Sequence, residues 1–220
     1  MEVLPQHFQQ QECYLENMIN QKTMLSHPYN WGIETLTINS DLLSLGKLAL
    51  TSASGIFPDG TVFNAPSIDA LPTQLPIPLS SKDCIVYLGI PLKNAGQANV
   101  TLSHQPTGHR YHSTTTTLDN NIAESKQSAD IQLGKLSLKL LLEGDDISQY
   151  CCIAIAKIKE VRSSECVALY DDIMTPVLSI NRCAKLKPFT QEIHSLLKHR
   201  ADSLAYRLTD TKQSAGSDIS

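Results

Sequence analysis

The sequence predicts a mainly β protein, a β-sandwich with one helix near each end of the chain. Leucines occupy every second position from Leu136 to Leu142, the period of a strand with one buried face. Pro58-Asp59-Gly60 is a strong turn sequence between two apolar arms. Further short apolar runs are separated by turn residues, as in sandwiches and related barrels. We expect residues 1–183 to form the sandwich domain with its N-terminal helix, and 184–220 to form a C-terminal helix and a disordered polar tail.

The N-terminal helix is expected from Leu4 to Leu25. Large apolar residues recur in it three, four and seven positions apart, on one face. They are Leu4, Phe8, Leu15, Met18 and Leu25. Gln11 and Lys22 interrupt this stripe, so we interpret the helix as amphipathic. Pro28 ends it, because proline disfavours helix in the residue before it.

Strand signals follow this helix. Residues 31–38 and 47–54 are rich in β-branched and aliphatic side chains, with turn residues between them. Residues 55–63 form the hairpin around Pro58-Asp59-Gly60. The proline-rich stretch 66–78 predicts an extended loop or a sheet edge, because proline removes ladder donors.

The second half of the chain predicts more strands. Residues 85–92 form a near-continuous apolar strand that we expect to be covered on both faces. The polar stretch 94–121 predicts a long hairpin or a mobile loop. The remaining strands are expected at 131–142, 152–161 and 166–170.

The last element, from Pro188 to Thr209, is predicted to be a helix. Its apolar residues lie on one stripe, which must cover the sheet or pack against other helices. The stripe residues are Ile193, Leu196, Leu197, Leu204 and Leu208. Arg200 interrupts the stripe. The small, polar residues that follow predict disorder.

Composition disfavours several function classes. The net charge is -4 and the basic residues are scattered, which disfavours nucleic-acid binding. No apolar stretch is long enough to span a membrane, and the start shows no secretory signal, so we expect a cytoplasmic protein. The 6 cysteines include no Cys-x-x-Cys pair and are therefore expected to be buried, reduced thiols.

The residues offer no catalytic or metal-binding constellation. His109-x-x-His112, with His104 nearby, is the best metal candidate, but on a strand this spacing points the two rings to opposite faces. We expect solvated loop histidines. The acidic clusters near Asp145 and Asp171 match no calcium loop and are expected at turns. Neither a Gly-x-Ser-x-Gly site nor a glycine-rich phosphate loop occurs. The sequence therefore predicts no enzymatic activity, no metal and no cofactor.

Five segments carry more specific motifs. They are Leu4–Glu16, Tyr29–Gly32, Gly55–Thr61, Val86–Leu92 and Asp171–Leu178. The first begins Leu-Pro-Gln-His-Phe-Gln-Gln-Gln, the second contains a Trp-Gly pair, and the third contains Phe-Pro-Asp-Gly-Thr. The fourth matches Tyr-Leu-x-x-Pro-Leu, and the fifth has an acidic residue before a Thr-Pro-x-Leu turn. In this order they resemble the TssK family of type VI secretion baseplate subunits, in which the turn reads Pro-Pro-x-Leu and Thr175 here replaces the first proline.

The resemblance implies a scaffold of three parts. A β-sandwich shoulder, like that of phage receptor-binding proteins, would dock on TssF and TssG wedge proteins, helices of a neck would trimerise, and a head would reach the TssL and TssM membrane complex. This chain would comprise the shoulder and the first neck helix. Family members carry about one strand before the motif that here begins at Leu4. We therefore expect an incomplete subunit, a fragment or the product of a disrupted frame, with an open sheet edge and no head.

The expected contacts with TssF and TssG lie on the polar side of the first helix and on a projecting turn. These residues are Gln6, His7, Gln9, Gln10, Pro58, Asp59 and Gly60. Stabilising the fold is an equal alternative for each of them. The stripe of the last helix would supply the trimer contact. An alternative function is a free-standing β-sandwich that binds a carbohydrate or a receptor, although aromatic residues are few and Trp31 is the single indole. A hydrolase ranks third.

Overall fold

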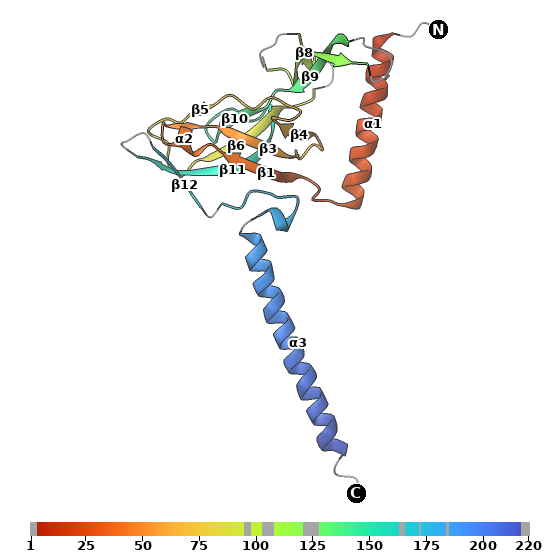
Figure 1. The fold of residues 1–220 in the computed structure, drawn as a ribbon, viewed down its shortest axis with the longest axis vertical. Coiled ribbons are helices and arrows are strands. Elements are labelled where there is room, and N and C mark those ends of the chain that lie inside the picture. Colours follow the sequence, from red (N-terminus) through yellow and green to blue (C-terminus); the bar gives the residue numbers. More distant parts are fainter. Residues whose placement is uncertain are drawn as a thin grey trace. The chain divides into compact units, whose positions relative to one another are not determined.

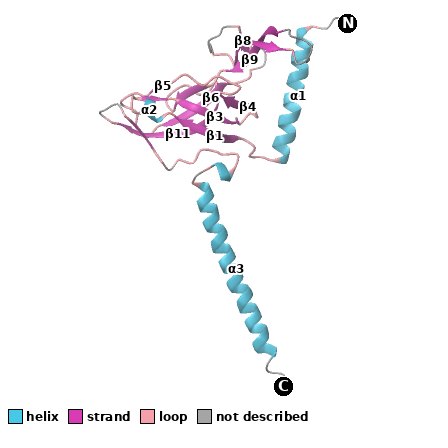
Figure 2. Cartoon of the chain, viewed as in Figure 1, coloured by secondary structure: helices cyan, strands magenta, loops and turns pink. Residues whose placement is uncertain are grey.

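The computed structural model divides into two compact units, Met1–Leu178 and Ser179–Ser220 (Figure 1). It describes residues 4–94, 98–102, 108–120, 128–162, 166–171, 173–183 and 185–216, with side chains in the last helix described through Arg207. The first unit contains the strands together with two helices, whereas the second unit consists of helices (Figure 2). The division falls a few residues before the boundary predicted from the sequence.

Helix α1 (Pro5–Ser26) confirms the predicted N-terminal helix. Its first turn contains Pro5, where the missing N–H costs no helical hydrogen bond. The His27 N–H donates to the Thr23 carbonyl at 2.8 Å, and His27 itself is extended. None of the helix residues is buried, and of the expected apolar stripe only Met18 is half-buried, whereas Leu4, Phe8, Leu15 and Leu25 are exposed.

Two antiparallel sheets form the sandwich, as the sequence predicted. The first has the order β1-β3-β4, with β1 (Gly32–Ile38), β3 (Leu50–Ile56) and β4 (Val62–Ala65). The second has the order β10-β6-β11-β12, with β10 (Lys139–Leu142), β6 (Ile85–Pro91), β11 (Tyr150–Val161) and β12 (Val167–Leu169). The long pairing of β6 with β11, from Tyr150 opposite Pro91 to Lys157 opposite Ile85, forms the centre of the second sheet.

Smaller elements surround the two sheets. Strand β2 (Lys47–Leu48) pairs with β5 (Leu75–Pro76) in the proline-rich stretch. Strand β7 (Val100–Thr101) runs parallel to β8 (Tyr111–Asp119), which pairs with β9 (Ser128–Leu136) along its whole length. The predicted turn after β1 is the short helix α2 (Ser40–Leu43), because Asn39 Oδ1 accepts the N–H groups of Asp41 and Leu42.

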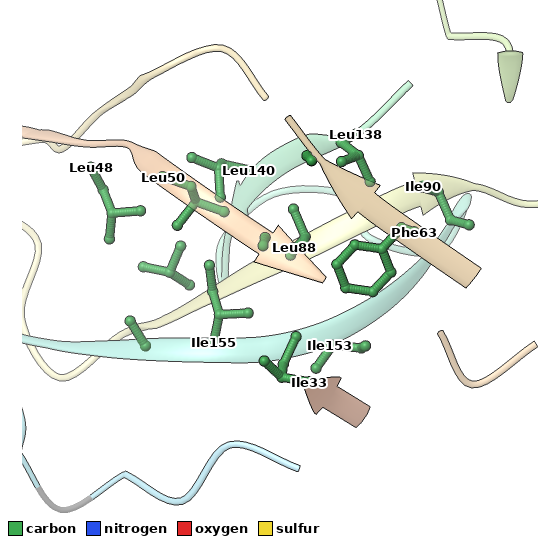
Figure 3. Close-up of a cluster of buried hydrophobic side chains, with 14 of the residues drawn as sticks. Ile33, Leu48, Leu50, Phe63, Leu88, Ile90, Leu138, Leu140, Ile153 and Ile155 are labelled. Atoms are coloured by element: carbon green, nitrogen blue, oxygen red, sulfur yellow. The ribbon is translucent and has the colours of Figure 1, made fainter. Parts of the chain in front are cut away.

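The core lies between the two sheets (Figure 3). Leu88 and Ile90 of β6 are 0% exposed, and Ile153 of β11 is 1% exposed. Phe63 of β4 and Leu50 of β3 meet them from the other sheet. Burying each such side chain contributes about 1.5–3 kcal/mol, so this contact between the sheets is the main source of the first unit's stability.

The leucine run does not form the single strand that its alternation predicted. Strand β9 ends at Leu136 and β10 begins at Lys139, and the two strands belong to different sheets. Between them, the Ser137 N–H donates to the Arg110 carbonyl at 2.9 Å. Leu138 and Leu140 are buried in the same core as Leu136, so alternate leucines remain buried although the chain passes from one sheet to another.

The second unit consists of the 3-10 helix η1 (Ile180–Arg182) and helix α3 (Leu186–Gly216). Helix α3 is longer than predicted and continues through residues 210–216, where the sequence predicted a disordered tail. Every side chain from Lys187 to Arg207 is exposed. No helix among the described residues is both long and apolar enough to cross a membrane.

Candidate interaction surface

The turn at Pro58–Gly60 connects β3 to β4 with a defined hydrogen-bond pattern. The Gly60 N–H donates to the Phe57 carbonyl at 2.9 Å, and the Phe57 N–H donates to the Thr61 carbonyl at 2.9 Å. Asp59 Oδ1 accepts the Thr61 N–H at 3.0 Å. Gly60 has a φ of 86°, a conformation that glycine adopts without strain. The predicted hairpin is confirmed.

Asp59 also forms an ion pair that joins three segments. The Arg110 side chain is 3% exposed, and its Nη2 lies 2.6 Å from Asp59 Oδ2. Arg110 Nη1 donates to the Pro91 carbonyl at 2.7 Å, and Nη2 also donates to Thr61 Oγ1. The pair therefore ties the β3–β4 turn to the end of β6 and to the residue that precedes β8.

The electrostatics of this pair favour both charged forms. Burial alone would raise the pKa of Asp59, but the charge of Arg110 and hydrogen bonds from Arg110 and Thr61 lower that pKa below its usual value. Burial alone would lower the pKa of Arg110, but attraction to Asp59 and their hydrogen bond raise it. Removing either partner would leave the other charge poorly compensated, which is costly at a buried position.

The polar side of α1 packs on the same turn. Asn20 Nδ2 donates to the Asp59 carbonyl at 3.4 Å, and a Cβ at Gly60 would lie 2.7 Å from the Asn20 side chain. One helical turn earlier, Lys93 Nζ donates to Glu16 Oε2 at 2.7 Å, and this hydrogen bond raises the pKa of Lys93. The turn is therefore half-buried against the helix. The expectation of a projecting turn is wrong, because α1 covers it.

A cleft of about 930 Å³ lies between α1 and the sheet of β7, β8 and β9. Gln9, Gln10 and Cys13 line it from the helix, and Tyr111 lines it from β8. Two of the predicted interface residues therefore share one cleft. His7 has a different role, because its Nδ1 accepts the Leu4 N–H at 3.0 Å and thereby caps the helix.

The remaining predicted residue of the helix, Gln6, is exposed on its first turn. Sequence reasoning missed four residues that organise this surface. They are Glu16, Asn20, Lys93 and Arg110. Arg110 lies in a polar stretch that predicted a long hairpin or a mobile loop, and the others bind partners far away along the chain. A glycine after Pro-Asp indicated the turn but could not indicate what covers it.

The predicted histidine pair is His109 and His112. His112 is 7% exposed in β8, and its Nδ1 lies 3.3 Å from Ser137 Oγ, so the expectation of a solvated loop histidine is wrong for this residue. His104 lies outside the described residues. Across the part of the chain that the structure describes, no group of three or more His, Cys, Asp or Glu side chains could hold a metal ion.

The acidic cluster after β10 holds backbone groups, as predicted. Glu143 Oε2 accepts the Ile85 N–H at 2.9 Å, and Asp145 Oδ2 accepts the Leu142 N–H at 2.8 Å. Asp146 Oδ1 accepts the Ser148 N–H at 3.1 Å, and hydrogen bonds from Ser148 lower the pKa of Asp146. Asp145 and Asp146 therefore shape the turn after β10, and Glu143 holds the start of β6.

The apolar stripe of α3 is a second candidate surface. Ile193 is 41% exposed, Leu197 64% and Leu204 58%. Leu196 is also exposed, whereas the side chain of Leu208 lies outside the described ones.

Comparisons with protein families, with curated proteins and with solved structures all match this chain to proteins of type VI secretion. A family model described as bacterial type VI secretion, VC_A0110, EvfL, ImpJ, VasE, matches residues 7–220. The type VI secretion system baseplate component TssK1 of Pseudomonas aeruginosa PAO1 is 35% identical over 216 residues, 98% of this chain and 49% of that protein. A crystal structure of TssK superposes with a TM-score of 0.83 at 31% identity, over 94% of this chain and 47% of that one.

More distant structures share the fold. A chain of the TssK–TssF–TssG baseplate subcomplex, determined by cryo-electron microscopy, matches with a TM-score of 0.79 at 19% identity, over 93% of this chain and 68% of that one. The chain spans about half the length of the curated relative and of the crystallised TssK.

Proposed function

Because this chain belongs to the type VI secretion family that includes VasE and TssK, we propose that its sandwich docks on the TssF and TssG wedge proteins of a baseplate. The role is structural and non-enzymatic, and its place is the cytoplasmic side of the secretion apparatus. The observation that carries the proposal is the match of nearly the whole chain to TssK1, at 35% identity. The same fold occurs in a TssK–TssF–TssG subcomplex.

The geometry of the first unit suits a rigid docking module. The ion pair of Asp59 with Arg110 ties the β3–β4 turn to two other segments, and Asn20 ties the same turn to α1. A partner that contacts α1 and the cleft beside it would therefore meet a surface that is already ordered. Such preorganisation reduces the entropy lost on binding. Gln9 and Gln10 offer amide donors and acceptors at this cleft.

The second part of the proposal concerns α3. Its exposed leucine stripe would pack against the same helix of other copies, as the neck helices of a trimer. A helix without buried residues gains little stability alone, so association would supply the missing apolar contact. Arg200 is exposed on the same helix and limits the strength of a bundle made from one helix per chain.

The test is capture of purified TssF–TssG by the immobilised full chain, with a glycan array probed in parallel. We expect capture of TssF–TssG and no glycan binding. The double variant Gln9→Ala/Gln10→Ala should lower capture several-fold. Asn17→Ala, an exposed substitution elsewhere on the same helix, should leave capture unchanged. Clear glycan binding without capture would instead establish the alternative, a free-standing carbohydrate-binding module.

A further inference from the structure

Strand β9 forms one edge of the three-stranded sheet β7-β8-β9. It is 9 residues long and pairs with β8 from Ser128 to Leu136 without a register shift. Among the described residues, no strand pairs with its outer side. Its side chains from Ser128 to Gly134 are all exposed. Strand β9 is therefore a long and regular edge that the described part of the chain leaves open.

The other edge strands of the described sheets are short or covered. Strands β4 and β10 have 4 residues each, β12 has 3, and β2, β5 and β7 have 2 each. The longer edge strand β1 is covered at its start, where the Ile33 N–H donates to the Pro176 carbonyl at 2.8 Å. Folded proteins avoid long open edges, because the unpaired backbone groups pair with other chains. An open edge as long as β9 therefore indicates a partner strand.

The hydrogen bonds of the hairpin show which backbone groups of β9 point outward. The Ser137 N–H donates to the Arg110 carbonyl at 2.9 Å, so every second residue back from Ser137 bonds to β8. The residues between them direct their backbone groups to the open edge. Leu136 fits this alternation, because its N–H donates to Asp69 Oδ1 at 3.1 Å, outside the hairpin. The outward groups that remain belong to Ser128, Asp130, Gln132 and Gly134.

We propose that β9 receives an extended segment of the TssF–TssG wedge by strand addition. This inference rests on the proposed function and names the element of this chain that the wedge pairs with. The wedge is the expected partner because the edge adjoins the cleft beside α1. Gly134 of β9 lines that cleft together with Gln9, Gln10 and Tyr111. A segment paired with β9 would therefore lie along the cleft and contact both features at once.

The side chains of the hairpin specify the chemistry of the added segment. Ile131 is 43% exposed and Leu133 36%, and Leu118 of β8, on the same face, is 44% exposed. Gln132 and Gly134 lie on the opposite face, because successive side chains of a strand alternate. Side chains directly across a strand pair interact, so the added strand would place apolar residues beside Ile131 and Leu133. The partner is thus an extended peptide of alternating apolar and polar residues.

The test removes one outward N–H. Gln132→Pro deletes this donor but no hydrogen bond between β8 and β9, since the Gln132 N–H points to the open edge. The affinity of TssF–TssG for the immobilised full chain should fall about tenfold or more. Gln132→Ala keeps the N–H and should leave the affinity unchanged. Thr115→Pro, directly opposite on β8, is the matched control and should also bind as the wild type does. Urea denaturation with Trp31 fluorescence shows whether each variant is folded.

Hydrogen exchange of the wild-type chain provides a measurement without substitutions. Binding of TssF–TssG should slow the exchange of the outward N–H groups of Asp130, Gln132 and Gly134, and leave those of Thr115 and Thr117 unchanged. Capture without this protection, or wild-type affinity of a folded Gln132→Pro variant, would overturn strand addition and leave wedge docking intact. The same protection in the concentrated chain alone would show pairing between copies and overturn it as well. No capture by the wild type would instead overturn the proposed function, and strand addition with it.

Discussion

The sandwich and helix α3 differ in where their apolar side chains lie. In the sandwich, Leu88, Ile90 and Phe57 are 0% exposed. In α3, Leu196, Leu197 and Leu204 are each more than half exposed. The sandwich thus buries apolar side chains in its own core, whereas α3 leaves its apolar stripe exposed, available for the association proposed above. One chain therefore combines a unit that folds around its own core with a helix whose apolar side chains are exposed.

Substitutions in these two regions should therefore affect different properties, the stability of the sandwich and the association of the chains. Substitutions in the sandwich core should lower the free energy of unfolding and leave the oligomeric mass of the folded fraction unchanged. Substitutions on the stripe of α3 should do the reverse. Trp31 packs against the core and supplies a fluorescence signal for unfolding of the sandwich.

The largest effect is expected from Leu88→Ala in the central strand β6. Leu88 is 0% exposed between the two sheets, so truncation removes apolar burial and leaves a cavity. The free energy of unfolding should fall by about 3–4 kcal/mol, measured by urea denaturation with Trp31 fluorescence. A loss below about 1 kcal/mol would mean that the sheets are not tightly packed at this point.

Arg110→Met should have the next largest effect, a loss of about 3 kcal/mol at neutral pH, because it leaves the Asp59 carboxylate without its charged partner. The pKa of Asp59 in the folded state lies below its ordinary value of 3.8, so the pair stabilises the fold above that pH. This contribution is lost as the pH falls toward the folded-state pKa.

Urea denaturation between neutral and acid pH tests whether the stabilisation depends on the charge of Asp59. The difference in the free energy of unfolding between the wild type and Arg110→Met should be constant near neutral pH and should shrink below about pH 4. Lys82→Met provides a control, since this lysine is exposed and forms no ion pair among the described residues. A difference in the free energy of unfolding that stays constant down to acid pH would contradict the stabilising ion pair of Asp59 with Arg110.

Gly60→Ala should cost about 1–2 kcal/mol, through strain at positive φ and through contact with α1. The added Cβ would lie 2.7 Å from the Asn20 side chain. Combining Gly60→Ala with Asn20→Ala should therefore cost less than the sum of the two single changes. Strict additivity in this double-mutant cycle would show that α1 does not press on the turn.

The smallest effect on unfolding is expected from Leu197→Glu/Leu204→Glu. Both side chains are exposed, so the free energy of unfolding of the sandwich, at a protein concentration too low for association, should change by less than about 0.5 kcal/mol. The mass of the chain at high concentration should fall, measured by light scattering. Ser195→Glu, an exposed change off the leucine stripe, serves as the matched control.

Sequence reasoning predicted those features that depend on local pattern. The Pro58-Asp59-Gly60 turn, the apolar strand β6 and both long helices depend on nearby residues and were predicted correctly. The leucine run after residue 130 was misinterpreted, because alternation records burial but not a change of sheet between Leu136 and Lys139.

The candidate surface depends on contacts between residues far apart in the sequence. Asp59 and Arg110 are 51 positions apart, and Glu16 and Lys93 are 77 apart, so no local pattern pairs them. The apolar stripe of α1 predicted an amphipathic helix, but it could not show which side faces the sandwich. In the structure Asn20 and Glu16 contact the rest of the unit, and Phe8, Leu15 and Ile19 are exposed.

Wedge docking is tested most directly by the affinity of TssF–TssG for three forms of the chain, measured by surface plasmon resonance with the chain immobilised. The forms are the wild type, Leu197→Glu/Leu204→Glu and Gln9→Ala/Gln10→Ala. If the sandwich carries the interaction, the α3 variant should keep the wild-type affinity for each captured copy, and the cleft variant should lose several-fold. Loss of binding by the α3 variant alone, with the cleft variant unchanged, would contradict docking through the sandwich.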